Sequence, residues 1–261
     1  AASDVYKRQD PNRLYVFGIS EGGYGSQRLA SFYADYWAAA GPMAGGEPLK
    51  NAPIENLRNT PFSLLTGALD EGFYRNKLTA YTKAALEQTK FVYRVELLPG
   101  YGHHIDYSLT TPWLAQYKRN PTPLHVSWED FEMDGRYRRG FSNLVVLERP
   151  DTQGRTYYDE VISNNTINLS VHNVTYTTIE KDTIWGIALK FQKHFTPATS
   201  GKIRIYLSEN QIDLKRPVRI LVNGQEKFNG RLRPSLKAMA ESLSVFYDPE
   251  RIFPVYVDIT I

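Results

Sequence analysis

The segment Gly18-Ile19-Ser20-Glu21-Gly22 carries residue types that suit a serine nucleophile. It fits the pattern G-x-S-x-G, in which a serine stands on a sharp turn between a buried strand and a helix. Such a turn lifts the serine Oγ clear of the sheet, and small flanking residues, here Gly18 and Gly22, permit the close backbone approach that it requires. The backbone N–H of Glu21, next to the serine at a helix N-terminus, would face a developing oxyanion. The sequence therefore predicts nucleophilic chemistry on a carbonyl at Ser20.

A carboxylate candidate follows the next apolar run along the chain. Phe62–Thr66 is typical of a buried strand, and Asp70 and Glu71 come directly after it, in a turn flanked by Gly67 and Gly72. In a doubly wound sheet, sites form outside the carboxyl ends of the strands. We therefore expect Asp70 to be the carboxylate that orients a catalytic base, with Glu71 as second choice and a solvated turn as the alternative.

Two of the five histidines, His103 and His104, lie in the loop that follows a predicted strand at Phe91–Leu98. A histidine there is a candidate general base for the serine. The two histidines near Asp106 also raise the question of a metal site. They lack the i, i+4 helical spacing of zincins, so we predict no metal. A structural pair capping a helix is the other alternative.

Alternating strand and helix patterns surround these candidates. Leu14–Phe17 is an uninterrupted apolar run, as in a strand buried on both faces of a parallel sheet. Apolar residues at i, i+3, i+4 and i+7 then predict one face of a helix, formed by Leu29, Phe32, Tyr33 and Tyr36. The remaining expected elements are a buried strand at Trp37–Ala40 ended by Gly41-Pro42, a helix over Asn76–Lys90 and a closing helix over Tyr107–Lys118.

Asp10–Gly25, with the sequence DPNRLYVFGISEGGYG, resembles the nucleophile segment of the α/β-hydrolase superfamily, of the esterase and prolyl-oligopeptidase-like kind. The resemblance covers about Asp10–Asn120 and implies a triad in the order Ser20, Asp70, His103. In the superfamily the triad histidine often ends the sequence pattern Gly-x-Gly-His, which Gly100–His103 matches. The resemblance therefore favours His103 as the base over His104. The resemblance also implies that about half of the usual sheet precedes this segment. We expect residues 1–9, AASDVYKRQ, to be a non-native leader, because they resemble a translated adapter sequence.

The period of the apolar residues changes in the second half of the chain. After a proline-containing linker at residues 121–127, alternation with period two predicts an all-β antiparallel sandwich over residues 128–261. Val218–Val222 followed by Asn223-Gly224 indicates a hairpin with a type I′ turn. A short helix is expected around Leu236, Met239, Ala240 and Leu243. The predicted fold class is thus α/β, with a partial hydrolase sheet and flanking helices, followed by this sandwich.

Composition excludes several classes of function. A net charge of +3 is too small and too scattered for nucleic-acid binding, and no apolar run is long enough to span a membrane. The chain has no cysteine, so it has neither disulfides nor thiol chemistry. The 18 tyrosines leave glycan contact through the sandwich domain as an alternative to ordinary cross-strand packing.

The sequence therefore predicts a serine hydrolase that cleaves a carboxylic ester through an acyl-enzyme without a cofactor. Two alternatives stay open. One is a peptidase of the same fold, and the other is a non-catalytic module that binds glycan or protein beside a degenerate hydrolase scaffold. Export to the periplasm or the extracellular space follows from the resemblance alone.

Overall fold

The computed structural model describes residues 9–184 and 186–261, and in that part of the chain it shows a mixed α/β architecture with three sheets. The chain divides into two compact units. One unit ends at Asn120 and also includes Tyr176–Gln192, and the other comprises Pro121–Thr175 and Lys193–Ile261. The leader predicted at residues 1–9 lies, apart from Gln9, outside the described residues.

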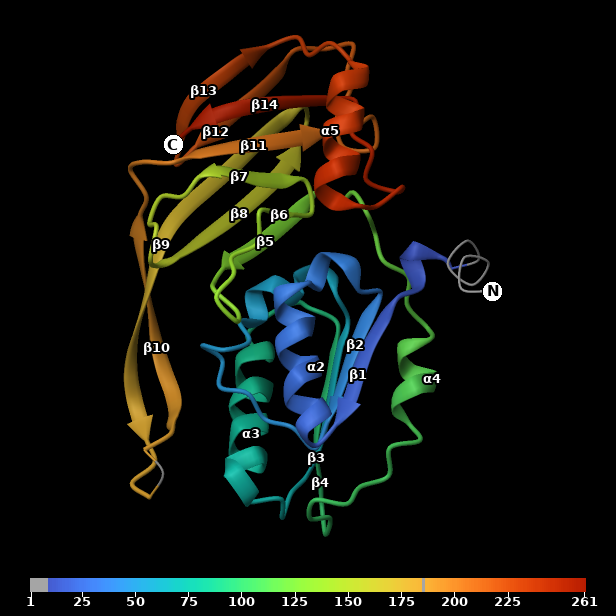
Figure 1. Cartoon of the computed structure of the whole chain (residues 1–261), viewed down its shortest axis with the longest axis vertical. Coiled ribbons are helices and arrows are strands. Elements are labelled where there is room, and N and C mark those ends of the chain that lie inside the picture. Colours follow the sequence, from blue (N-terminus) through green and yellow to red (C-terminus); the bar gives the residue numbers. More distant parts are fainter. Residues whose placement is uncertain (1–8, 185) are drawn as a thin grey trace. The chain divides into compact units, whose positions relative to one another are not determined.

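The first unit is built on a parallel sheet with the strand order β1-β2-β3-β4 (Figure 1). Its strands are β1 (Tyr15–Ile19), β2 (Ala39–Met43), β3 (Phe62–Gly67) and β4 (Tyr93–Leu98). Every residue of β2 and β3 is buried. The prediction of a strand buried on both faces is wrong for β1, because this strand lies at the edge of the described sheet and its Phe17 is 51% exposed.

Three helices pack on the strands of this sheet. α2 (Glu21–Phe32) packs against β1 and β2, α3 (Arg75–Leu86) packs against β3 and β4, and α4 (Thr110–Leu114) packs against β2. Short 3-10 turns complete the unit: η1 (Pro11–Arg13), η2 (Ala34–Tyr36), η3 (Ile54–Asn59) and η4 (Gly72–Tyr74). No helix in the described part of the chain is long and apolar enough to cross a membrane.

The apolar face predicted for α2 is not the face that packs on the sheet. Leu29 and Tyr33 are 36% and 37% exposed, whereas the buried positions are mostly small or polar: Gly23, Ser26, Gln27, Ala30, Ser31 and Phe32. The reason is the closeness of the helix to the sheet. A Cβ on Gly23 would lie 2.3 Å from the backbone oxygen of Met43, at the end of β2. Small residues such as Gly23 and Ala30 are therefore buried, while Leu29 and Tyr33 are partly exposed.

Two further expectations are corrected by the same unit. β2 continues through Gly41-Pro42 to Met43, although the sequence pattern predicts that these residues end it. A Cβ on Gly41 would lie 2.6 Å from the Thr110 side chain. The glycine at this position of β2 therefore leaves room for α4 to pack on the strand. The closing helix expected over Tyr107–Lys118 is reduced to the five residues of α4, and Pro112 lies inside it.

The second unit contains two sheets. One has the order β13-β12-β9-β8-β5, with β10 also pairing β9, and the other has the order β14-β11-β7-β6. β12 pairs β9 in parallel, so the unit is not purely antiparallel as expected. The bounds are β5 (His125–Asp130), β6 (Gly140–Phe141), β7 (Leu144–Glu148), β8 (Arg155–Ser163), β9 (Thr166–Lys181), β10 (Ala188–Pro197), β11 (Lys202–Leu207), β12 (Val218–Val222), β13 (Gln225–Gly230), α5 (Leu236–Phe246) and β14 (Val255–Thr260).

The alternating pattern of the sequence correctly marks the core of this unit. Ile167, Leu169 and Val171 of β9 are buried, as are the alternating aliphatic residues of β14. The predicted hairpin joins β12 to β13, and positive φ angles of 48° at Asn223 and 79° at Gly224 fit the type I′ turn. Between the sheets, the ring of Trp128 in β5 stacks on Phe141 in β6 at 5.4 Å. The finer classification as a sandwich stays a prediction.

β8 carries a fully buried carboxyl group at Glu160. Its Oε1 accepts a hydrogen bond from Asn143 Nδ2 at 3.2 Å, and its Oε2 has no hydrogen-bond partner in the described part of the chain. Burial of the charged form raises the pKa of Glu160 to about 8. The folded protein therefore holds a proton here at neutral pH that the unfolded chain releases.

The glycines of α2 offer a matched test of close helix packing. We expect Gly23→Ala to destabilise the protein by about 2 kcal/mol or more, because the new methyl group meets the Met43 carbonyl. Gly25→Ala places its methyl in open space and should be stabilising by up to about 1 kcal/mol through helix propensity. Urea unfolding measures both changes. Equal stabilities for the two variants would contradict the packing argument.

Glu160→Gln should alter how stability depends on pH. In the wild type, Glu160 should contribute a fall in the unfolding free energy of at most about 1.4 kcal/mol per pH unit as the pH rises from about 4.5 to about 8. Glu160→Gln should lose this contribution, whereas the exposed control Glu209→Gln should keep it. Asp130, whose pKa burial raises to about 7, adds a separate fall that both Gln variants keep. Urea unfolding across this pH range provides the measurement. Parallel curves for Glu160→Gln and the wild type would show that the carboxyl is ionised in the folded protein.

Candidate active site

Ser20 lies at the sharp turn between β1 and α2, in the position that the sequence pattern predicts. Its φ of 59° and ψ of −116° are outside the regions that residues with a side chain ordinarily adopt. The turn is held because the Ser20 N–H donates to the Met43 carbonyl at 3.0 Å and the Ser20 carbonyl accepts from the N–H groups of Gly23 and Tyr24. This backbone path directs the Ser20 Oγ away from the strand.

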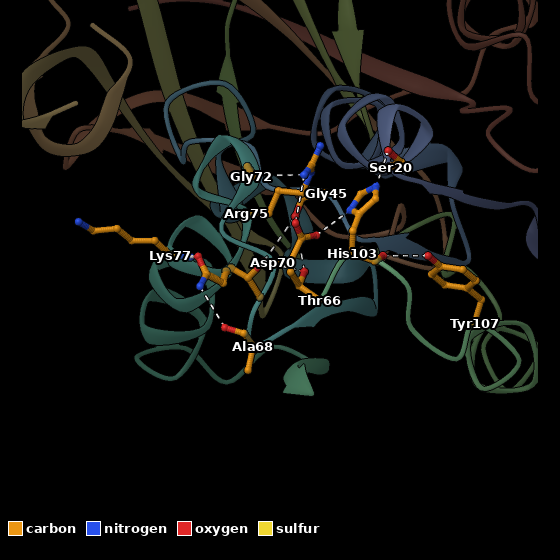
Figure 2. A network of polar contacts seen from close by, with 12 residues as sticks. Ser20, Gly45, Thr66, Ala68, Asp70, Gly72, Arg75, Lys77, His103 and Tyr107 are labelled. Atoms are coloured by element: carbon orange, nitrogen blue, oxygen red, sulfur yellow. Dashed lines mark hydrogen bonds and ion pairs between the residues drawn. The ribbon is translucent and has the colours of Figure 1, made fainter. Parts of the chain in front are cut away.

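Asp70 lies beyond the end of β3 and is 3% exposed. Its backbone is fixed on both sides, since its N–H donates to the Gly67 carbonyl and its carbonyl accepts from the Asn76 N–H. One carboxylate oxygen, Oδ1, accepts a hydrogen bond from Arg75 Nη1 at 3.1 Å. Arg75 also donates to the Gly72 carbonyl at 3.1 Å, so its guanidinium group cross-links the turn that carries Asp70 (Figure 2).

His103 lies beyond the end of β4 and links the other two residues. Its Nδ1 lies 2.8 Å from Asp70 Oδ2 and its Nε2 lies 2.9 Å from Ser20 Oγ (Figure 2). The backbone carbonyl of His103 accepts a hydrogen bond from the Tyr107 hydroxyl. The structure therefore brings Ser20, Asp70 and His103 into one chain of hydrogen bonds, although they come from three separate strand ends.

The loops of Asp70 and His103 are joined through their backbones. The Ala68 N–H donates to the Leu98 carbonyl and the Leu69 N–H donates to the Tyr101 carbonyl, each at 2.9 Å. A Cβ on Gly67 would lie 1.9 Å from the Gly102 oxygen. Because β3 and β4 are adjacent parallel strands, this contact brings the histidine loop directly to the acidic turn.

The second-choice residues lie outside this chain of hydrogen bonds. His104 is exposed, its ring centre lies 6.0 Å from that of His103, and it has no hydrogen bond to another described residue. Glu71 is exposed as well.

Asp106, the acid near the two histidines, is hydrogen-bonded within its own loop. Hydrogen bonds from the side chain and the N–H of Ser108 lower the pKa of Asp106. Among the described residues, no group of three or more His, Asp or Glu side chains could hold a metal ion.

The expected oxyanion donor has a free N–H group. Glu21 is the first residue of α2, and its N–H donates to no acceptor in the described part of the chain.

The reason for the two glycines of the turn is only partly as predicted. A Cβ on Gly18 would lie 2.3 Å from the Gly22 oxygen, whereas a Cβ on Gly22 would meet nothing within 4 Å. Steric crowding therefore explains Gly18 but not Gly22.

A pocket of about 460 Å³ opens beside Ser20. Its lining includes four residues that the sequence patterns do not single out: Tyr24, Glu47, Arg75 and Ile187. Tyr24 and Arg75 could have been found from the sequence, because Tyr24 lies one helical turn after Ser20 and Arg75 lies five residues after Asp70. Ile187 has none, since it reaches the first unit only through the segment Tyr176–Gln192.

That segment belongs to the first unit by its contacts with α3 and η4. Glu180 near the end of β9 accepts a hydrogen bond from Tyr81 and pairs with Lys77. Asp182 accepts a hydrogen bond from the Tyr74 hydroxyl. Three polar contacts thus join this segment to residues of α3 and η4 that are far from it in the sequence.

This arrangement is suited to nucleophilic substitution at a carbonyl group. His103 lies at hydrogen-bond distance from the Ser20 hydroxyl and can take its proton, while Asp70 holds the ring and favours the proton on Nδ1. The free Glu21 N–H at the helix N-terminus suits a developing negative charge. No protein-family model matches the chain, and no curated protein sequence matches it.

The hydrogen bond between His103 and Asp70 can be tested by proton NMR. A short bond of an imidazole N–H to a buried carboxylate moves the Nδ1 proton far downfield, so we expect one such resonance at low temperature. It should vanish in His103→Gln and persist in His104→Gln. A resonance that follows His104 instead would contradict this geometry.

Proposed function

We propose that this chain is part of a serine hydrolase that cleaves a carboxylic ester through an acyl-enzyme. The observation that carries the proposal is the continuous chain of hydrogen bonds from Ser20 Oγ through the His103 ring to Asp70. The strained backbone of Ser20 and the free N–H of Glu21 add independent support. No cofactor takes part in the proposed reaction.

The proposed reaction runs in two halves. His103 Nε2 takes the proton of Ser20 Oγ as the oxygen attacks the substrate carbonyl, and the oxyanion forms beside the Glu21 N–H. The ester C–O bond breaks, and the alcohol leaves with the proton from Nε2. Water then attacks the acyl-Ser20 carbonyl, gives a proton to Nε2, and releases the acid as Ser20 regains its hydrogen.

Two features of the site support enzymatic activity over a degenerate scaffold. Asp70 is buried, has its charge satisfied by Arg75 and is held against a histidine, and arrangements of this kind are concentrated at functional sites. The Ser20 conformation is also costly, by about 1–3 kcal/mol, and such strain is concentrated at functional sites. An amide is the alternative substrate, since the same residues can protonate an amine leaving group.

Labelling by a fluorophosphonate probe tests the proposed nucleophile. We expect the wild type to be labelled on Ser20 and to hydrolyse p-nitrophenyl butyrate, and we expect both activities to be lost in Ser20→Ala. His103→Gln should lower kcat by about 10⁴- to 10⁶-fold, because the serine then lacks its base. Mass spectrometry of the labelled peptide identifies the modified residue.

His104→Gln is the matched control, since it removes a neighbouring imidazole that makes no hydrogen bond within the described residues. It should keep activity close to the wild type. Comparison of p-nitrophenyl butyrate with the butyryl anilide then separates esterase from amidase activity. A folded, soluble protein that contains this chain and takes up no label at Ser20 would overturn the proposal.

A further inference from the structure

Each of the four parallel strands ends in a segment that brings a polar residue to the same edge of the sheet. Ser20 follows β1, Asp70 follows β3 and His103 follows β4. The fourth residue is Glu47, which follows β2 and lines the pocket together with Ser20. The proposed reaction uses three of these residues and leaves Glu47 without a role.

Glu47 is a buried carboxylate with an incomplete set of partners. Only 8% of the residue is exposed, and Oε2 accepts a hydrogen bond from Asn51 Nδ2 at 2.9 Å. No other hydrogen bond to the carboxylate and no ion pair of Glu47 occurs among the described residues. Arg28 is near enough to act on its charge but makes no ion pair with it. Desolvation raises the pKa of Glu47 above its ordinary value.

The position of Glu47 is fixed from both sides. Its N–H donates to Gln27 Oε1 in α2 at 3.0 Å, and Asn51 holds the carboxylate from four residues further on. Gly46 is just as constrained, because a Cβ there would lie 3.0 Å from the Cα of Arg75. The side chain therefore lines the pocket from a rigid backbone, as a binding group should.

The carboxylates of the pocket lining favour a cation. Glu21 and Glu47 contribute two negative charges to its lining, and the positive charge of Arg75 is already paired with Asp70. The Arg75 guanidinium also lies over the rings of Tyr24 and Phe73, with its Cζ 5.6 Å and 5.2 Å from the two ring centres. These rings already have a cationic partner, so a second cation in the pocket would depend on the Glu47 carboxylate.

Building on the proposed hydrolysis at Ser20, we infer that the pocket selects substrates that carry an ammonium group, which Glu47 binds. An N⁺–H donor would supply the partner that the Glu47 carboxylate lacks, and the bond would be charge-assisted. Such a bond should raise the affinity about 10- to 100-fold, which corresponds to about 1.4–2.8 kcal/mol. Glu47 is thus a specificity-determining residue and takes no part in the bond changes at the carbonyl.

Three small molecules of equal length but different charge test this inference on the wild-type protein. n-Butylammonium, n-butanol and butyrate are compared as inhibitors of p-nitrophenyl butyrate hydrolysis, with Ser20→Ala giving the uncatalysed rate. We expect n-butylammonium to inhibit competitively with a Ki about 10- to 100-fold below that of n-butanol. Butyrate should be the weakest of the three.

Glu47→Gln tests the assignment to this residue. The substitution keeps the size of the side chain and should reduce the preference for n-butylammonium over n-butanol to near unity. Glu87→Gln, an exposed position outside the pocket lining, should keep the wild-type preference. If Glu47→Gln does not fold, the three inhibitors on the wild type still decide the inference.

A binding measurement separates this inference from the proposed function. Titration with n-butylammonium should shift the NMR signals of the Asn51 side-chain amide, which touches the Glu47 carboxylate, whether or not Ser20 is reactive. Equal affinity for n-butylammonium and n-butanol in a protein that labels at Ser20 would overturn the inference alone. A protein that does not label but shows the shift would overturn the proposed hydrolysis alone. A preference that survives in Glu47→Gln would also overturn the inference.

Discussion

The close approach of helix α2 to the sheet is the constraint on which the geometry of the proposed active site depends. A Cβ on Gly23 would lie 2.3 Å from the Met43 oxygen, and a Cβ on Gly45 would lie 2.7 Å from the Gly23 carbonyl carbon. Because the helix begins immediately after Ser20, its distance from the sheet determines how sharply the chain must turn there. The positive φ of Ser20 is a consequence of that turn, and packing of the helix retains it. A looser helix would relax the serine and withdraw its Oγ from His103.

The remaining site residues are positioned by the order of parallel strands. β1, β2, β3 and β4 are adjacent in that order, so their carboxyl ends form one continuous edge. Backbone hydrogen bonds between the loops after β3 and β4 then fix Asp70 relative to His103. Main-chain hydrogen bonds therefore fix the positions of the loops that carry the site. Side chains such as Arg75 then add charge to loops that the backbone already holds in place.

Sequence patterns identified the strands and the three chemistry-bearing residues that the structure brings together. Ser20, Asp70 and His103 could be found because each follows a strand in an order that the G-x-S-x-G turn makes meaningful. The face of α2 could not be found in this way. Periodicity selects large apolar residues, but the face that packs closest to the sheet is lined by small ones such as Gly23 and Ala30. α5 repeats this exception, since Leu236 is 83% exposed while Ala238 and Ser242 are buried.

Long-range contacts set the second limit on prediction from sequence. Nothing in the pattern of β9 and β10 indicates that Tyr176–Gln192 contributes Ile187 to a pocket formed by residues near the start of the chain. Glu47 is hidden for a different reason, because a single acid in a loop rich in glycine and proline looks like any solvated turn residue. Only the burial of its carboxylate distinguishes it.

Asp70 and Glu47, two of the buried carboxylates of the first unit, differ in how their charge is satisfied. Asp70 accepts hydrogen bonds from Arg75 and His103, so it is complete within the folded protein. Glu47 accepts one bond from a neutral amide, and desolvation is the largest effect on its carboxyl group. A hydrogen-bond donor bound in the pocket would offset part of that cost. Under the further inference, that donor is the ammonium group of the substrate. Glu47 has fewer partners than Asp70 within the folded protein, so it gains more when the pocket is filled.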